Sequence, residues 1–127
     1  MANLSLQEFD QNSVNIVPFQ FNTQEIRVTL IDGNPWFIGK DVCNVLEVKD
    51  SSTAYSRLKG YEKLTRLITV SGQNREMVVI SESGLYRLVL TSRKPQSEPF
   101  QDWVVQEVLP SIRKTGKLFR FTVNREA

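Results

Sequence analysis

The sequence contains no histidine and a single cysteine, Cys43, among its 127 residues. The absence of histidine removes the most common general base and the most common metal ligand of proteins. One cysteine cannot form an internal disulfide, which fits a reducing cytoplasm, and Cys43 is best interpreted as a small buried apolar residue. The sequence also lacks a metal-ligand cluster, a glycine-rich phosphate loop and a nucleophile–base pair. We therefore expect a protein that is not an enzyme and needs no cofactor or metal.

Long apolar runs are also absent. No run approaches the ~20 residues that a membrane helix needs. The N-terminal stretch MANLSLQEFDQ has neither the basic region nor the apolar region of a secretory signal. The length favours one domain with its own core, and we expect no membrane partner.

The net charge of +2 hides an uneven distribution along the chain. Residues 1–56 hold three basic and seven acidic residues, a net charge of −4, whereas residues 57–120 hold twelve basic and six acidic residues, a net charge of +6. A basic half beside an acidic half suggests an anionic partner on one side. An ordinary surface of mixed charge is the alternative interpretation.

Alternating apolar residues and turn residues predict two β-hairpins. Asp32-Gly33 is the turn signal of the first, because glycine tolerates a positive φ, and Ser71–Arg75 is the loop of the second. Residues 1–23 are expected to form a poorly ordered lead-in that contains one further strand. The predicted strands are Ile16–Phe21, Gln24–Ile31, Trp36–Ile38, Leu64–Val70 and Glu76–Ile80.

Helical spacing and capping residues predict four helices. Two short ones cover Lys40–Glu47 and Ser52–Lys59, the second capped by Asp50 or Ser51 and ended by Gly60. The first of the two longer helices is capped by Ser81 or Ser83 and stopped by Pro95; the second is capped by Ser97 and ends at Gly116. Pro110 predicts a kink near Leu109, because proline cannot donate to the carbonyl one turn back.

The order of these elements segregates strands from helices, which predicts an α+β fold. Two small β-hairpins would pack with four short-to-medium helices. The two short helices followed by a hairpin are also compatible with a winged helix-turn-helix arrangement, in which the second helix enters the major groove and the hairpin contacts the backbone.

Nucleic-acid binding is the best-supported chemistry in this pattern. The second short helix would present Tyr55, Ser56, Arg57 and Lys59, and the hairpin tip would present Gln73, Asn74 and Arg75, which suit phosphate oxygens and base edges. A second basic cluster lies near the ends of the long helices. The candidate DNA-binding residues are Lys40, Arg57, Lys59, Lys63, Arg75, Arg87, Arg93, Lys94, Arg113, Lys114 and Lys117.

Structural interpretations remain open for these residues. A solvated basic face explains any surface lysine, and cations near helix C-termini stabilise the helix by roughly 0.3–1 kcal/mol without a ligand. Asp32 is explained by its turn and Asp41 by a helix start. Trp36 and Trp103 are expected in the core, because each lies in an apolar periodic run.

Three stretches resemble the Bro N-terminal domain family of phage antirepressors and of the Bro proteins of large DNA viruses. They are PWFIGKDVCNVLEV (35–48), ESGLYRLVLTSRKP (82–95) and FQDWVVQEVLPSIRKTG (100–116). The resemblance frames a domain over residues 24–117, which leaves residues 118–127 as a tail or the start of a linker. Proteins of this family usually carry a second, C-terminal domain.

The resemblance implies a DNA-binding module of a phage or viral transcriptional regulator or antirepressor. The alternative is a protein–protein module that binds and inactivates a repressor without contacting DNA. A homodimer on paired half-sites is compatible with either, and Leu118–Val123 is a candidate pairing edge. The implied location is the cytoplasm of a bacterial host, or the host nucleus if the source is a eukaryotic virus.

Overall fold

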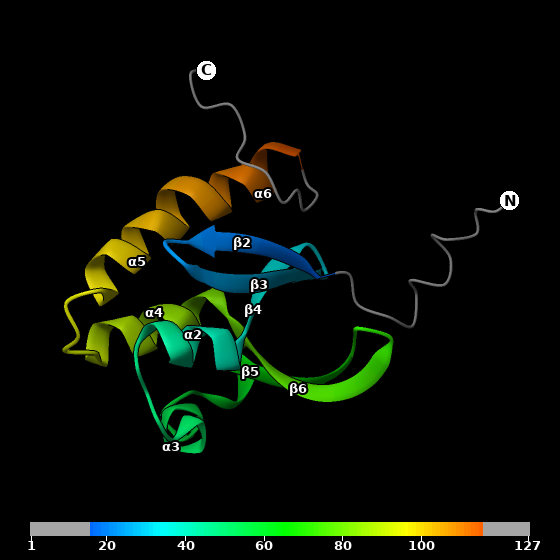
Figure 1. Ribbon diagram of the computed structural model, residues 1–127, viewed down its shortest axis with the longest axis horizontal. Helices are drawn as coiled ribbons and strands as arrows, with labels where there is room; N and C mark the ends of the chain where they lie inside the picture. The colour runs from blue at the N-terminus through cyan, green and yellow to red at the C-terminus, as the bar shows by residue number, and fades with distance from the viewer. Residues whose placement is uncertain (1–15, 116–127) are drawn as a thin grey trace, which may run out of the picture.

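A computed structural model describes residues 16–115 of the chain, with side chains up to residue 113 (Figure 1). Five antiparallel strands form one sheet in the order β2-β3-β4-β6-β5, which confirms the predicted α+β class. The strands are β2 (Val17–Phe21), β3 (Gln24–Ile31), β4 (Asn34–Ile38), β5 (Lys63–Val70) and β6 (Gln73–Ser81). The strand expected within the lead-in is β2, which pairs with β3.

Residues with positive φ close the hairpins. Asp32 and Gly33 have φ of 53° and 79°, as a tight two-residue turn requires, so the first predicted turn is confirmed. Ser71 and Gly72 have φ of 52° and 80° and make the same kind of turn. The predicted loop Ser71–Arg75 was therefore too long, because β6 already begins at Gln73.

The first helices follow the predicted positions with shorter bounds. They are α2 (Gly39–Val45), α3 (Ser51–Ser56) and α4 (Glu82–Thr91); a 3₁₀ turn, η1 (Gly60–Glu62), which the sequence did not predict, follows α3. Asp50 caps α3, and the Ser81 hydroxyl caps α4 by accepting the Gly84 N–H at 3.1 Å. The predicted helix Ser52–Lys59 was too long at its C-terminal end, since α3 ends at Ser56.

The last helical segment changes its hydrogen-bond register before Pro110. It consists of α5 (Ser97–Trp103), a π-helical turn η2 (Val104–Val108) and α6 (Leu109–Thr115). The Leu109 N–H donates to the Val104 carbonyl, five residues back. Proline has no N–H for the usual i−4 bond, so the expected irregularity takes the form of a π turn. Ser97 is not the cap: its hydroxyl donates to the Lys94 carbonyl at 2.6 Å, and Gln96 holds the cap position.

The main core lies between the helices and one face of the sheet. Ile26, Val28, Phe37 and Ile80 come from the strands and are fully buried against residues of α2, α4 and α5. Four aromatic rings attach β2 to α5, with ring-centroid distances of 5.2 to 6.4 Å, as edge-to-face and stacked pairs prefer. They are Phe19, Phe21, Phe100 and Trp103. Trp103, which was expected in the core, is half-buried and packs against the edge of the core through these contacts. A smaller cluster of Ile38, Ile68 and Val79, with Trp36 packed against it, occupies the opposite face.

A buried ion pair joins the sheet to α2. Asp41 accepts the backbone N–H of Arg27 at 2.8 Å and two further bonds from its guanidinium, also at 2.8 Å. The β3–β4 ladder includes only Val28 to Ile31 of β3. The backbone N–H of Arg27, directly before this ladder, therefore has no acceptor on β4, and Asp41 supplies one. The guanidinium pKa of Arg27 is raised by its hydrogen bond to Asp41. Asp41 therefore has a more specific structural role than the helix start expected of it.

None of the helices within residues 16–115 is long and apolar enough to cross a membrane. Some predictions fall outside the described residues: those for Gly116, Lys117, Leu118–Val123 and residues 1–15, and that for the side chain of Lys114.

Candidate nucleic-acid interface

Helices α2 and α3 are locked together by Tyr55. The Tyr55 ring lies so close to Gly39 that a Cβ there would come within 2.7 Å of its hydroxyl oxygen. Tyr55 is half-buried, and burial raises the pKa of its hydroxyl. Tyr55 was expected to face a nucleic acid, but its ring instead sets the position of α3. The outer surface of α3 carries Ser52, Thr53 and Ser56, followed by Arg57.

Local hydrogen bonds stabilise both ends of α3. The Asp50 carboxylate accepts hydrogen bonds from the hydroxyls of Ser52 (2.7 Å) and Thr53 (2.9 Å), which lower its pKa. At the other end, Lys63 Nζ donates to the Tyr55 carbonyl at 2.8 Å. Lys63, one of the predicted DNA-binding residues, thus caps a helix end in the structure.

A fully buried carboxylate, Glu62, ties η1 to α4. Arg87 donates to it through Nε (2.8 Å) and Nη2 (2.9 Å), and Ser83 Oγ donates at 2.9 Å. The Lys59 backbone N–H adds a fourth bond at 2.9 Å. The Arg87 guanidinium and these donors hold the pKa of Glu62 at about 2. Arg87, another predicted DNA-binding residue, is therefore neutralised by a buried partner, although 39% of its side chain remains exposed.

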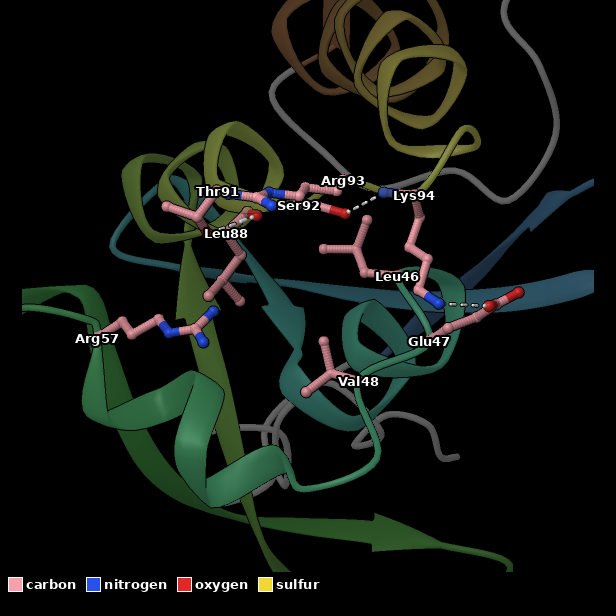
Figure 2. Close-up of a pocket in the computed structure, with 9 residues that line it drawn as sticks. All are labelled: Leu46, Glu47, Val48, Arg57, Leu88, Thr91, Ser92, Arg93 and Lys94. Atoms are coloured by element: carbon pink, nitrogen blue, oxygen red, sulfur yellow. Dashed lines mark hydrogen bonds and ion pairs between the residues drawn. The ribbon is translucent and has the colours of Figure 1, made fainter.

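Three other predicted residues meet at one pocket, where α2, α3 and α4 end. Leu46, Val48 and Leu88 are its apolar lining, and Arg57, Arg93 and Lys94 are its basic residues; Glu47, Thr91 and Ser92 complete it. Figure 2 shows Arg57 and Lys94 on opposite sides of the apolar side chains. Glu47 has φ of 58°, the left-handed conformation that often ends a helix. This turn brings its carboxylate within 3.3 Å of Lys94 Nζ.

The size and charge of the pocket limit what it can hold. Its volume of about 160 Å³ is below the ~300 Å³ at which pockets for whole small molecules begin. Three cations against one carboxylate favour an anionic group, and the Lys94–Glu47 pair is exposed on both sides, at 47% and 60%. Such surface pairs are weak. The pocket is suited to one phosphate-sized anion in exchange for Glu47, or to a single side chain.

The other predicted residues whose side chains the structure describes do not line this pocket. Lys40 lies exposed on α2, Lys59 between α3 and η1, and Arg113 on α6 near Tyr86. Arg75 lies in β6, where its guanidinium donates to the Gln73 side chain at 3.3 Å. Gln73, Asn74 and Arg75 therefore do not form the hairpin tip, which is Ser71-Gly72. Of the eleven predicted residues, the structure brings together Arg57, Arg93 and Lys94.

Two features of this region were not found from the sequence. The Glu62–Arg87 pair spans 25 positions, and no local pattern marks a glutamate as buried. Leu46 and Leu88 recur at helical spacing with other apolar residues, a pattern that predicts helix packing and does not by itself indicate a pocket. Within the part of the chain that the structure describes, no group of three acidic or cysteine side chains could hold a metal.

Comparison with known proteins places these features in context. The family model described as "BRO family, N-terminal domain" matches residues 25–110. An uncharacterised protein of Haemophilus influenzae is 41% identical over 111 residues, which cover 84% of this chain and 54% of the relative. No solved structure matches the chain.

Viral proteins are similar as well. A protein of Invertebrate iridescent virus 6 named as Bro-N domain-containing protein 201R is 35% identical over 116 residues, covering 75% of this chain and 28% of that protein. Protein 019R of Invertebrate iridescent virus 3, named in the same way, is 35% identical over 106 residues, covering 65% of this chain and 26% of its own. The chain thus spans about half of the bacterial relative and about a quarter of the viral ones.

Proposed function

Since the chain belongs to the BRO family, whose N-terminal domain it matches, we propose that it is a DNA-binding module of a transcriptional regulator or antirepressor. Binding uses Arg57, Arg93 and Lys94 at the pocket between α2, α3 and α4. It is not a catalytic function, and it needs no cofactor.

The observation that carries the proposal is the convergence of these cations from separate parts of the chain. Arg57 follows α3, and Arg93 and Lys94 follow α4, yet all three line one pocket that holds a single carboxylate. Phosphate contacts from arginine and lysine supply most non-specific DNA affinity. The hydroxyls exposed on α3 already donate within the helix, those of Ser52 and Thr53 to Asp50 and that of Ser56 to the Thr53 carbonyl, so the proposed phosphate contacts rest on the three cations.

Salt dependence of DNA binding tests the proposal. Fluorescence anisotropy with a labelled duplex of random sequence measures Kd for the full chain and for Arg57→Ala and Arg93→Ala. If about six phosphates are contacted, affinity falls roughly 10³-fold between 50 and 200 mM salt. Each substitution should weaken binding and lower the salt slope by about 1.

Arg113→Ala is the matched control, because it removes one exposed positive charge outside the pocket. Equal losses for Arg113→Ala and Arg57→Ala would mean that only net charge matters. Unchanged binding in both pocket variants would remove the pocket from the interface.

A second candidate function is capture of a protein such as a repressor, without DNA contact. It is favoured by two exposed apolar side chains near Arg87, Tyr61 at 71% and Leu90 at 77% exposure. Tyrosine and arginine are enriched in protein–protein contacts, whereas a phosphate group cannot make an apolar contact with a leucine side chain. Tyr61→Ala and Leu90→Ala should leave the anisotropy titration unchanged if DNA is the ligand of the pocket.

A further inference from the structure

The hairpin of β5 and β6 extends beyond the rest of the sheet. β4 pairs only with Val79–Ser81 at the end of β6, whereas every residue of β5 pairs with a residue of β6. The remainder of the hairpin is a two-stranded ribbon that curves away from the helices (Figure 1). Two-stranded ribbons are marginally stable in water.

β5 is the outer strand of this ribbon, and within the described residues it has no neighbour on its outer side. It is eight residues long, Lys63–Val70, and contains neither proline nor glycine. Natural edge strands are usually short or interrupted by proline, bulges or charges, because their free N–H and C=O groups invite another strand. Arg66 is the only charge in the interior of β5, so this edge is open to pairing.

The side chains of β5 are arranged symmetrically about its middle. On the face shared with the main core, Thr65 and Thr69 flank Leu67, a large apolar side chain with 52% exposure. On the other face, Leu64 and Val70 flank Arg66 and Ile68 and pack against the small apolar cluster. A strand with such a pattern is self-complementary in the antiparallel direction.

We propose that β5 pairs with β5 of a second copy of this chain, about a twofold axis through Leu67. Each Leu67 then lies opposite its copy, Thr65 opposite Thr69, Leu64 opposite Val70 and Arg66 opposite Ile68. Apolar and Thr–Thr cross-strand pairs stabilise a sheet, and a twofold contact needs such a self-complementary surface.

The neighbouring registers are less favourable, so this one is specified. Centring the axis on Arg66 places two arginines directly opposite each other, which is destabilising. Centring it on Ile68 places Leu64 opposite Gly72 and Arg66 opposite Val70. Of these three registers, only the one centred on Leu67 places apolar residues opposite each other on both faces of the sheet and avoids placing Arg66 opposite the Arg66 of the second copy. The pairing goes beyond DNA binding, because none of the pocket residues takes part.

The oligomeric state of the full chain tests this contact. Sedimentation equilibrium over the micromolar range should show a dimer for the natural sequence. Leu67→Lys and Leu67→Glu each place like charges opposite each other and should raise the dimer Kd roughly tenfold or more. An equimolar mixture of the two should dimerise again, because lysine then faces glutamate.

Leu90→Lys is the matched control, since it changes an exposed leucine of α4 in the same way and should leave the dimer intact. Circular dichroism and urea midpoints check that each variant folds. If Leu67→Lys does not fold, diamide oxidation of Leu67→Cys provides a second readout: facing thiols give a disulfide-linked dimer, whereas Leu90→Cys does not. A monomeric natural chain, an unaffected Leu67→Lys dimer or dissociation by Leu90→Lys overturns the proposal.

Discussion

Replacing Glu62 by glutamine tests the contact that fixes α4 against η1. Glu62 is fully buried and accepts four hydrogen bonds, two of them from Arg87. Glutamine keeps the shape of the side chain, but it removes the charge and directs an NH₂ group at donors. The substitution therefore measures the electrostatic part of the contact.

The magnitude follows from the pKa of Glu62, which is about 2 in the folded chain against an ordinary value of 4.5. That difference corresponds to roughly 3 kcal/mol of unfolding free energy at neutral pH. Because 39% of the Arg87 side chain is exposed, solvent screening lowers our expectation to about 2 kcal/mol. Since the folded pKa lies below the unfolded one, this stabilisation is complete above the unfolded value of 4.5 and is lost as pH falls towards the folded value of about 2.

Urea unfolding followed by circular dichroism, at neutral and acidic pH, provides the measurement. Glu62→Gln should lower the unfolding free energy at neutral pH, and the difference from the natural chain should shrink below pH 4.5. Glu76→Gln, on the exposed hairpin, is the control and should cost less than about 0.5 kcal/mol. A gap between the natural chain and Glu62→Gln that persists unchanged at low pH, or an equal loss in Glu76→Gln, would refute the assignment.

One further substitution and one reactivity measurement probe the packing. Gly84→Ala should destabilise by about 1–3 kcal/mol in urea, because its Cβ would lie 2.7 Å from Ile80 and 3.0 Å from the Glu62 carbonyl oxygen; Gly60→Ala, with nothing within 4 Å, is its control and should be close to neutral. The buried Cys43 thiol, whose pKa is raised by burial, should react with a thiol reagent only after unfolding; rapid reaction in the native chain would contradict the buried position.

The sequence predicted most elements because their signals are local. Ser81 and Asp50 act as caps, and Asp32-Gly33 makes its turn, since each depends on residues within a few positions. The errors were also local in origin. Ser71-Gly72 is a complete two-residue turn, and the polar residues after it were read as loop although they continue β6.

What the sequence did not predict depends on long-range pairing. β4 pairs with β6 across the two short helices, and no pattern within either strand selects that partner. The same limit applies to Glu62 and Arg87, whose contact depends on how η1 meets α4. Arg57 and Arg93 were predicted as binding residues, but their meeting at one pocket required the ends of three helices to be placed.

The basic residues differ in how much it costs to break their present ion pair so that they can contact another anion. Arg87 holds a buried carboxylate through two bonds, and releasing it would leave Glu62 uncompensated in the interior, which is costly. Lys94 faces an exposed carboxylate at 3.3 Å, and surface pairs of this kind contribute only about 0–1 kcal/mol. Arg57 and Arg93 follow the ends of their helices, where the dipole favours a cation by roughly 0.3–1 kcal/mol. A cation near a helix end keeps its charge, so stabilising a helix end and contacting a phosphate are compatible roles for the same side chain.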